Sequence, residues 1–150
     1  NNLESEINAV FERGFLTEEE KNAVDRKQLK SFFESSLCAR ILKSPLVMRE
    51  KKFMINVPIS EVYPELSQFE NESVMIQGIA DCAFLENGEL VVLDYKTDRL
   101  ETKEQFCEKY ENQVRTYKKA LELCTGYKVR ETLLYSFFLS CEIKIEAENK

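Results

Sequence analysis

The stretch FLENGELVVLDYK, residues 84–96, decides how the middle of this chain folds. Asn87-Gly88 stands between two apolar runs. This dipeptide is typical of a two-residue type I′ turn, because both of its positions need a positive φ. The pattern therefore predicts a β-hairpin built from Val74–Leu85 and Leu90–Lys96.

The register of this hairpin brings two acidic residues together. With the two-residue loop in place, Glu86 faces Glu89, and the same register places Asp81 directly opposite Asp94. The Cβ atoms of such cross-strand partners lie about 4.5–5.5 Å apart. Two negative charges about 5 Å apart repel by roughly 3 kcal/mol at an effective dielectric near 20. We therefore expect another group to offset this repulsion.

We expect the surroundings of the two aspartates to be apolar. Side chains alternate between faces in a strand, so Asp94 and Lys96 share one face with Leu90 and Val92. The residues across from them on that face are Ile79, Ala83 and Leu85. The opposite face carries Ile76, Ala80, Cys82, Phe84, Val91, Leu93 and Tyr95. The pattern predicts a hairpin buried on both faces, as central strands are.

Three arrangements can offset the repulsion between Asp81 and Asp94. One carboxylate can be protonated, Lys96 can act as a counter-ion, or both carboxylates can hold a divalent cation. A single lysine cancels only one charge, whereas a hard cation accepts several oxygen ligands, so we favour Mg²⁺, with Mn²⁺ as a substitute. In the simpler alternative, the aspartates end strands that reach solvent and Lys96 is their surface partner.

Glu104–Cys124 is predicted to form a long helix that ends at Gly126, a residue typical of the position after a helix. One stripe of this helix carries Phe106, Tyr110, Gln113, Tyr117, Leu121 and Cys124. A glutamine in such a stripe needs hydrogen-bond partners. We expect Gln113 and Tyr117 to reach into the site from the same helix face. In the alternative, Gln113 lies at the edge of the stripe and Tyr117 belongs to the core.

Sequence patterns in the rest of the chain predict helices in the N-terminal third and further strands after it. The helical patterns are Leu3–Arg13, a segment that begins with a capping box at Thr17 and Glu20, and a segment from Asp25 that Ser35 and Ser36 can divide and Pro45 ends. The remaining strands are Val47–Val57, whose alternation is weak, and Val129–Leu139, with residues 58–72 as a surface loop. The predicted class is α/β (α+β), a central mixed sheet flanked by helices.

The composition limits the kind of protein. The 150 residues, 43% of them hydrophobic, are enough for one domain with its own core, which we place at residues 1–150. No stretch has the roughly 18 to 20 apolar residues of a membrane span, so we expect no membrane partner and a cytoplasmic location. The net charge of −6 excludes nucleic-acid binding by bulk electrostatics, so any such contact must be local.

The histidine and cysteine content limits the catalytic and metal-binding chemistry that is possible within the chain. The chain has no histidine, which excludes Ser-His-Asp and Cys-His catalysis within it. Its five cysteines are widely spaced and include no C-x-x-C pair, so we expect neither a zinc site nor an iron–sulfur cluster. We expect cysteines in the middle of elements, such as Cys82 and Cys124, to be small buried hydrophobic residues.

Three motifs together resemble the PD-(D/E)XK nuclease superfamily. They are Gly78-Ile79-Ala80-Asp81, Leu93-Asp94-Tyr95-Lys96-Thr97-Asp98 and Gln113-x-x-x-Tyr117. The resemblance is to the RecB-like branch, and within it to the C-terminal nuclease domain of AddA (RexA)-type subunits of bacterial ATP-dependent helicase–nucleases. It implies a restriction-endonuclease-like core and a metal-dependent exonuclease that hydrolyses DNA phosphodiester bonds during double-strand-break repair and recombination.

The resemblance also implies roles for individual residues. Asp81, Asp94 and the backbone carbonyl of Tyr95 match the metal ligands of the family. Lys96 matches the residue that positions the attacking water or stabilises the charged phosphorane. Which group takes the proton from the water stays open.

Other positions match supporting elements of the family. Glu50, at the start of a strand, matches an acidic residue near the metal, and Gln113 and Tyr117 match a helix motif that supports the site and the DNA. In one respect the sequence departs from the family, because RecB-like members carry a histidine metal ligand on an upstream helix. We expect that ligand to precede Asn1, in a longer parent chain from which the N-terminal part of this domain is missing.

The expected partners are DNA, the helicase domains of the parent chain and a second, AddB/RexB-like subunit. Two other functions remain open at this point. One is an autonomous restriction-like or junction-resolving endonuclease, which usually acts as a dimer. The other is a non-catalytic module that binds DNA or a partner on the same fold.

Overall fold

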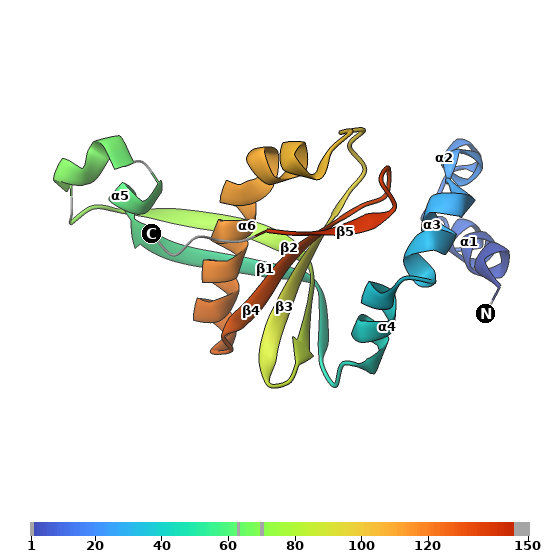
Figure 1. The fold of residues 1–150 in the computed structure, drawn as a ribbon, viewed down its shortest axis with the longest axis horizontal. Helices are drawn as coiled ribbons and strands as arrows, with labels where there is room; N and C mark the ends of the chain where they lie inside the picture. The colour runs from blue at the N-terminus through green and yellow to red at the C-terminus, as the bar shows by residue number, and fades with distance from the viewer. Residues whose placement is uncertain (1, 63, 70, 146–150) are drawn as a thin grey trace.

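The core of the molecule is a five-stranded mixed sheet with helices packed on both faces (Figure 1). The structure is a computed structural model that describes residues 2–62, 64–69 and 71–145. The strands lie side by side in chain order, and only β3 and β4 are parallel. The strands are β1 Val47–Pro58, β2 Ser73–Glu86, β3 Glu89–Lys96, β4 Val129–Ser136 and β5 Cys141–Lys144. This arrangement confirms the predicted α/β class.

The helices follow local capping signals. Thr17 and Glu20 form the expected capping box, and Ser35 accepts a hydrogen bond from the N–H of Cys38, which separates α3 from α4. The helices are α1 Leu3–Glu12, α2 Glu18–Ala23, α3 Arg26–Phe33, α4 Ser36–Lys43, α5 Ile59–Val62, the 3₁₀ helix η1 Pro64–Phe69 and α6 Lys103–Thr125. Within the described ranges, no helix combines the length and the apolar character needed to cross a membrane.

The predicted turn between β2 and β3 is confirmed. Asn87 has a φ of 54° and Gly88 a φ of 84°, as a type I′ turn requires. Glu86 pairs with Glu89, and the ladder continues in the predicted register as far as Cys82 and Leu93. A helix joins β3 to β4 because parallel neighbours need a long crossover connection, and α6 supplies it.

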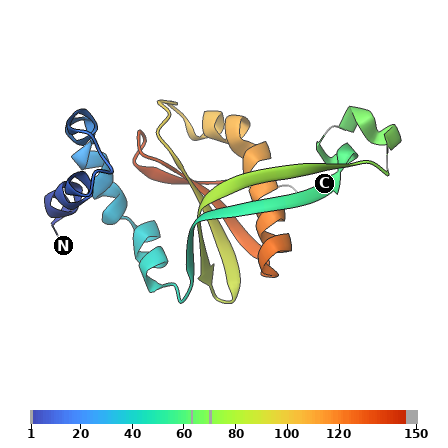
Figure 2. The same ribbon diagram turned by 180° about the vertical axis from the view of Figure 1, so that it is seen from behind.

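The two faces of the sheet carry separate cores. On one face, Phe32 of α3 and Leu37 and Ile41 of α4 pack against Leu93 and other residues of the central strands. On the other face, α6 contributes Ala120 and Leu121 to clusters with the first three strands. Figure 2 shows from behind how the long β1 and β2 strands extend past α6 as a two-stranded arm, defined here as residues 51–58 and 73–80, toward α5 and η1.

At one position, at the base of this arm, β1 and β2 change the face of the sheet to which their residues point. Within the described strands, pairing passes from Arg49–Cys82 to Lys51–Ala80, so Glu50 and Asp81 form the one skipped step between β1 and β2. Met48 and Phe53, an odd number of residues apart, both pack on the α6 side, as do Ala83 and Ala80. In a regular strand such residues point to opposite faces. The positive φ of Glu50, 48°, lies at this break.

This change of phase corrects the predicted faces of the hairpin. Ile76 and Ala80 pack on the α6 side, not with Cys82 and Phe84. Ile79, predicted to be buried on the face that carries Asp94 and Lys96, is 47% exposed. The prediction that both faces are buried is therefore wrong for the arm, although it holds for the central part of the hairpin. The prediction assumed that side chains alternate strictly between the two faces along each strand. Such a pattern cannot reveal a position at which both paired strands change face together.

Three further predictions differ from the structure. Residues 58–72, predicted as a loop, contain α5 and η1. The predicted strand Val129–Leu139 ends at Ser136, where a turn leads into β5, which the sequence reading missed. Cys82 is buried as expected, but Cys124 is exposed, because it lies beyond the part of α6 that the sheet covers. All five cysteines are free thiols.

Candidate functional site

Asp81 and Asp94 lie at the centre of the sheet, where the β2–β3 ladder ends. The register predicted from the turn stops one step before them, at Cys82 and Leu93. In place of the next ladder bond, Asp81 Oδ2 accepts a hydrogen bond of 2.9 Å from the backbone N–H of Tyr95. Asp94 is 3% exposed, and its neighbour Val92 packs in the cluster that α6 covers. Both acids therefore stand where α6 crosses the sheet.

The Lys96 ammonium is held by groups on three sides. It forms an ion pair with Asp94 Oδ2 and donates a hydrogen bond of 2.8 Å to Gln113 Oε1. It also lies 3.9 Å from the centre of the Tyr110 ring, a cation–π distance. The Lys96 side chain is only 12% exposed. The structure thus brings Gln113 of α6 to Asp94 and Lys96 at the end of β3.

Gln113 connects this lysine to Tyr117. The amide group of Gln113 accepts from Lys96 on its oxygen and donates from its nitrogen to the Tyr117 hydroxyl at 3.1 Å. Both hydrogen bonds orient the amide in one way, because its oxygen can only accept and its nitrogen can only donate. The Tyr117 ring packs edge-on against Phe53, with centroids 5.6 Å apart. The two predicted interpretations of Tyr117 therefore combine, since its ring belongs to the core and its hydroxyl to the site.

Glu50 occupies a different position from the other candidates. It lies on β1, opposite Asp81 at the skipped pairing step, and is exposed. Its side chain forms no ion pair or hydrogen bond with another residue in the described part of the chain. Three acids nevertheless occupy neighbouring positions on the adjacent strands β1, β2 and β3, namely Glu50, Asp81 and Asp94.

Burial and neighbouring charges shift the ionisation of the site. Burial raises the pKa of Asp94, Lys96 lowers it, and the charge of Asp81 raises it again. Burial also raises the pKa of the Tyr117 phenol, and the charges of Asp94 and Asp81 raise it further. The charge of Asp81 thus acts on the pKa of Asp94, and the charges of both aspartates act on the pKa of Tyr117. Asp94 Oδ2 is fully buried, and among the described residues no donor other than the Lys96 ammonium is near it.

The donor set fits a cation that prefers oxygen. Among residues 2–62, 64–69 and 71–145, no group of three or more His, Cys, Asp and Glu side chains is placed to hold a metal ion. Two carboxylates with a backbone carbonyl are nevertheless a set typical of Mg²⁺, which keeps several water ligands and often needs only one or two protein carboxylates. Asp94 Oδ2 is fully buried and is paired only with the Lys96 ammonium among the described residues, which leaves this carboxylate able to bind such a cation.

The sequence reading missed two residues that contact this site. Tyr110, which it placed only on the helix stripe, stacks on Lys96 and donates a hydrogen bond of 2.6 Å to Asp98. Asp98 also accepts from Lys109 at 2.6 Å. A signal was present, because Tyr110 precedes Gln113 by three residues and so lies on the same helix face.

A third missed feature is the contact between Gly78 and Phe53. These residues are cross-strand partners, and a Cβ at Gly78 would lie 2.6 Å from the Phe53 ring. The absence of a side chain at Gly78 therefore lets Phe53 lie flat across β2 and support Tyr117. The contact depends on the register of β1 on β2. It could not be predicted because the sequence contains no clear signal for that register.

Comparison with known proteins agrees with this geometry. Residues 1–148 match the family described as the PD-(D/E)XK nuclease superfamily, and the chain belongs to this family. It is similar to proteins that are named as the A component of an ATP-dependent helicase/nuclease. The relative from Clostridium acetobutylicum is 38% identical over 148 residues, and that from Thermoanaerobacter sp. (strain X514) is 40% identical over 139 residues.

These alignments cover most of this chain but a small part of each relative. They span 97% and 91% of the chain, and 12% and 11% of the two relatives. A relative from Clostridium botulinum (strain Okra / Type B1) is 38% identical over 96% of the chain and 11% of its own length. The chain thus spans about a tenth of the length of the curated relatives it matches.

Proposed function

We propose that this chain is the Mg²⁺-dependent DNA nuclease domain of a bacterial helicase–nuclease. The observation that carries the proposal is the position of Lys96, whose ammonium is held between Asp94 and Gln113 on the side of the sheet that α6 covers. A buried lysine beside a pair of acids is costly unless the group is used or paired. In a member of this nuclease family, hydrolysis of a phosphodiester is the reaction that uses both charges.

Asp81, Asp94 and the Tyr95 carbonyl are the proposed ligands of the cation. An extended residue directs its N–H and C=O toward the same neighbouring strand. Because the Tyr95 N–H donates to Asp81, its carbonyl is expected on the same side. A bound Mg²⁺ supplies a Lewis acid and a more acidic water ligand. Mn²⁺ has similar ligand preferences and is expected to substitute.

Lys96 provides a fixed positive charge for the reacting phosphate. An ammonium has three donors and no acceptor, and Gln113 and Asp94 each accept from one side of it. A free donor can then bind the attacking water or the oxygen on which negative charge grows during attack. Positioned charge of this kind is often the largest single contribution to catalysis.

Glu50 and the two α6 residues have supporting roles in the proposal. Gln113 orients the lysine, and Tyr117 orients Gln113 through its hydroxyl. Glu50 is exposed beside Asp81 and can accept hydrogen bonds from water ligands of the cation without binding it directly.

The proposed biological role follows from the named relatives. As part of a longer helicase/nuclease chain of the AddA type, the domain degrades DNA as an exonuclease in the cytoplasm during double-strand-break repair and recombination. Its partners are the helicase domains of the parent chain and a second, AddB/RexB-like subunit. The helicase domains feed the DNA strand, which compensates for the net charge of −6 on this domain.

Substitution in the parent protein tests the enzymatic proposal. Asp94→Ala or Lys96→Ala is expected to abolish DNA cleavage while ATP-driven unwinding continues at the wild-type rate. A matched control is Glu89→Ala, which removes an acid from the other end of the same strand. Cleavage at the wild-type rate by the Asp94 variant contradicts the proposal.

Thermal stability with added Mn²⁺ tests the cation site separately. A ligand present at 100 times its Kd and bound only by the folded state adds about 2.7 kcal/mol to the free energy of unfolding. Mn²⁺ is expected to raise Tm in the wild-type protein and in Glu89→Gln, and to have a smaller effect in Asp81→Asn. Equal shifts in all three proteins exclude this site and favour a non-catalytic module. A dimer that cuts DNA by itself favours an autonomous endonuclease.

A further inference from the structure

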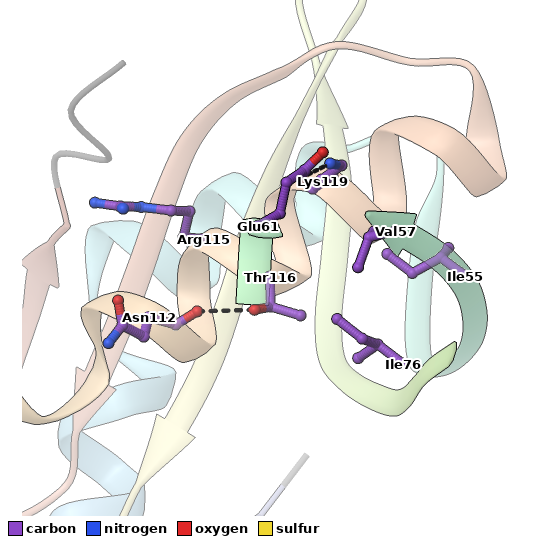
Figure 3. A pocket seen from close by; sticks show the side chains of 8 residues that line it. All are labelled: Ile55, Val57, Glu61, Ile76, Asn112, Arg115, Thr116 and Lys119. Carbon is purple, nitrogen blue, oxygen red and sulfur yellow. Dashed lines mark hydrogen bonds and ion pairs between the residues drawn. The ribbon is translucent and has the colours of Figure 1, made fainter. Parts of the chain in front are cut away.

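A cleft of about 380 Å³ lies between α6 and the β1–β2 arm, beside α5. We call it the α6 cleft (Figure 3). Its apolar wall consists of three side chains of the arm, Ile55, Val57 and Ile76. Opposite them, α6 contributes Asn112, Arg115, Thr116 and Lys119, and α5 contributes Glu61. The cleft therefore has one apolar side and one polar side with cationic groups.

The α6 cleft adjoins the proposed active site through α6. Its residues Asn112 and Thr116 immediately precede Gln113 and Tyr117, and successive residues of a helix are about 100° apart around its axis. The two helix faces are therefore neighbours. The Tyr117 ring packs in the same apolar cluster as the wall of the cleft, while its hydroxyl accepts from Gln113 in the site. Tyr117 thus contacts the apolar cluster of the cleft wall with its ring and Gln113 of the proposed site with its hydroxyl.

The cations of the cleft are paired with carboxylates that a phosphate can replace. Lys119 forms an ion pair with Glu61, and Arg115 forms one with Glu111 on the previous turn of α6 at 2.6 Å. All four side chains are exposed by 40% to 46%. Exposed pairs of this kind contribute little to stability. A phosphate oxygen offers the same hydrogen-bond acceptors as the carboxylate that it displaces.

The size and lining of the cleft suit an unpaired nucleotide. Its volume is at the lower end of the roughly 300–1,000 Å³ that small-molecule sites span. Unpaired bases need an apolar surface for their faces, and their phosphates need cations. A paired duplex offers no free base face to the apolar wall. Because the protein carries a net charge of −6, such local cations are needed to hold a strand.

We propose that the α6 cleft holds an unpaired nucleotide of the DNA strand next to the scissile phosphate. Its base lies against the apolar wall, and its backbone phosphates contact Arg115 and Lys119 in place of Glu111 and Glu61. This assignment deepens the nuclease function proposed above and rests on it.

Photocrosslinking tests the assignment without requiring cleavage. A single-stranded oligonucleotide that contains 4-thiothymidine is irradiated with the intact protein in EDTA, and the crosslinked peptides are identified by mass spectrometry. Crosslinks are expected in the peptide that contains Ile55 and Val57 or in the peptide that contains Thr116. The same label within a fully paired duplex is expected to react much less. Crosslinks from the single strand that avoid both peptides overturn the assignment.

Two adjacent lysines provide a matched pair of variants. Lys119 faces the cleft, whereas Lys118 lies on another side of α6, beside Val129 and Arg130. One phosphate contact to single-stranded DNA changes the logarithmic salt slope by about 0.7, which is about fivefold in Kd at 0.1 M salt. Lys119→Gln is therefore expected to raise the Kd, measured from crosslink yield, by about fivefold. Lys118→Gln is expected to leave it within about twofold.

A third variant tests the competing carboxylate. Glu61→Gln removes the group that occupies Lys119 and is expected to lower the Kd. Equal losses in the Lys118 and Lys119 variants overturn the proposal, because they show a general effect of charge. A protein that crosslinks in the cleft but does not cut DNA contradicts the nuclease function alone. A protein that cuts DNA but crosslinks elsewhere contradicts the cleft alone.

Discussion

The Lys96 ammonium lies 3.9 Å from the centre of the Tyr110 ring. Asp94 and Gln113 contact the same ammonium from other directions. The Tyr110 hydroxyl is anchored by its hydrogen bond to Asp98, two residues beyond the lysine. Tyr110 therefore positions Lys96 through its ring and is itself positioned through its hydroxyl.

Substitution of Tyr110 separates these two contributions. A cation–π contact contributes about 0.5–2 kcal/mol, so Tyr110→Leu is expected to lower kcat for DNA cleavage by about 2- to 30-fold with little change in KM. Tyr110→Phe keeps the ring and is expected to retain most of the activity. The measurement is steady-state cleavage by both variants in the parent protein. If Phe loses as much activity as Leu, the anchor to Asp98 matters and the ring contact does not.

Gly78 is predicted to be intolerant of even one added methyl group. The Cβ of Gly78→Ala would lie 2.6 Å from the Phe53 ring, so the ring must move away from Tyr117. Overpacking of this kind costs about 1–3 kcal/mol, which denaturant unfolding measures as a lower midpoint. Phe53→Leu makes room for the methyl group, so the double variant is expected to be more stable than the sum of the two losses predicts. Strict additivity contradicts a direct clash.

The backbone conformation that places Glu50 beside Asp81 is predicted to lower the stability of the fold. A non-glycine residue with positive φ costs about 1–3 kcal/mol, and Glu50 has a φ of 48°. Glu50→Gly is therefore expected to raise Tm, and Glu50→Val to lower it. Lys52→Gly, at an exposed position of the same strand, is the control and is expected to lower Tm. A lower Tm in Glu50→Gly contradicts the strain argument.

Glu86 is predicted to make stability depend on pH. Arg40 donates hydrogen bonds of 2.9 Å to both oxygens of Glu86, and these lower the pKa of the Glu86 carboxyl below its usual 4.5. Because the folded pKa lies below the unfolded value, this stability is present above about pH 4.5 and is lost as pH falls through the folded pKa. The pair holds α4 to the β2–β3 turn.

Unfolding of Glu86→Gln across a pH series checks this dependence. At pH 7 the variant is expected to lose at most about 1.5–3 kcal/mol, the usual contribution of hydrogen bonds to charged groups. The difference from the wild type is expected to shrink below pH 4.5. Glu89→Gln, across the turn, is the control and is expected to change little at any pH. A difference for Glu86→Gln that stays constant down to pH 3 contradicts the assignment.

Local signals in the sequence predicted most of the elements. A capping box marked the start of α2, Ser35 and Ser36 marked the division between α3 and α4, and Gly126 has the positive φ expected of the residue that ends α6. The errors have a common origin in tertiary context. Period-two patterns could not show that β1 and β2 change phase together at Glu50 and Asp81, because only the register of one strand on the other defines that step.

The contacts of the candidate site could be predicted only in part. The turn register predicted the β2–β3 ladder as far as Cys82 and Leu93, one step short of the two acids, and helix spacing predicted that Gln113 and Tyr117 share a face. The hydrogen bond from Lys96 to Gln113 and the stacking of Lys96 on Tyr110 depend on where α6 crosses the sheet. That crossing is a result of packing between Leu121 and the central strands, which no local pattern specifies.

By itself the sequence determined the turn at residues 87 and 88 and, through it, the register of β2 on β3, because backbone sterics at two positions allow one tight connection. The tertiary structure alone decided which helix residues meet Lys96 and where the arm turns its other face to α6. The physical reason is range: turn geometry depends on adjacent residues, whereas the docking of α6 depends on apolar surfaces that folding brings together from distant parts of the chain.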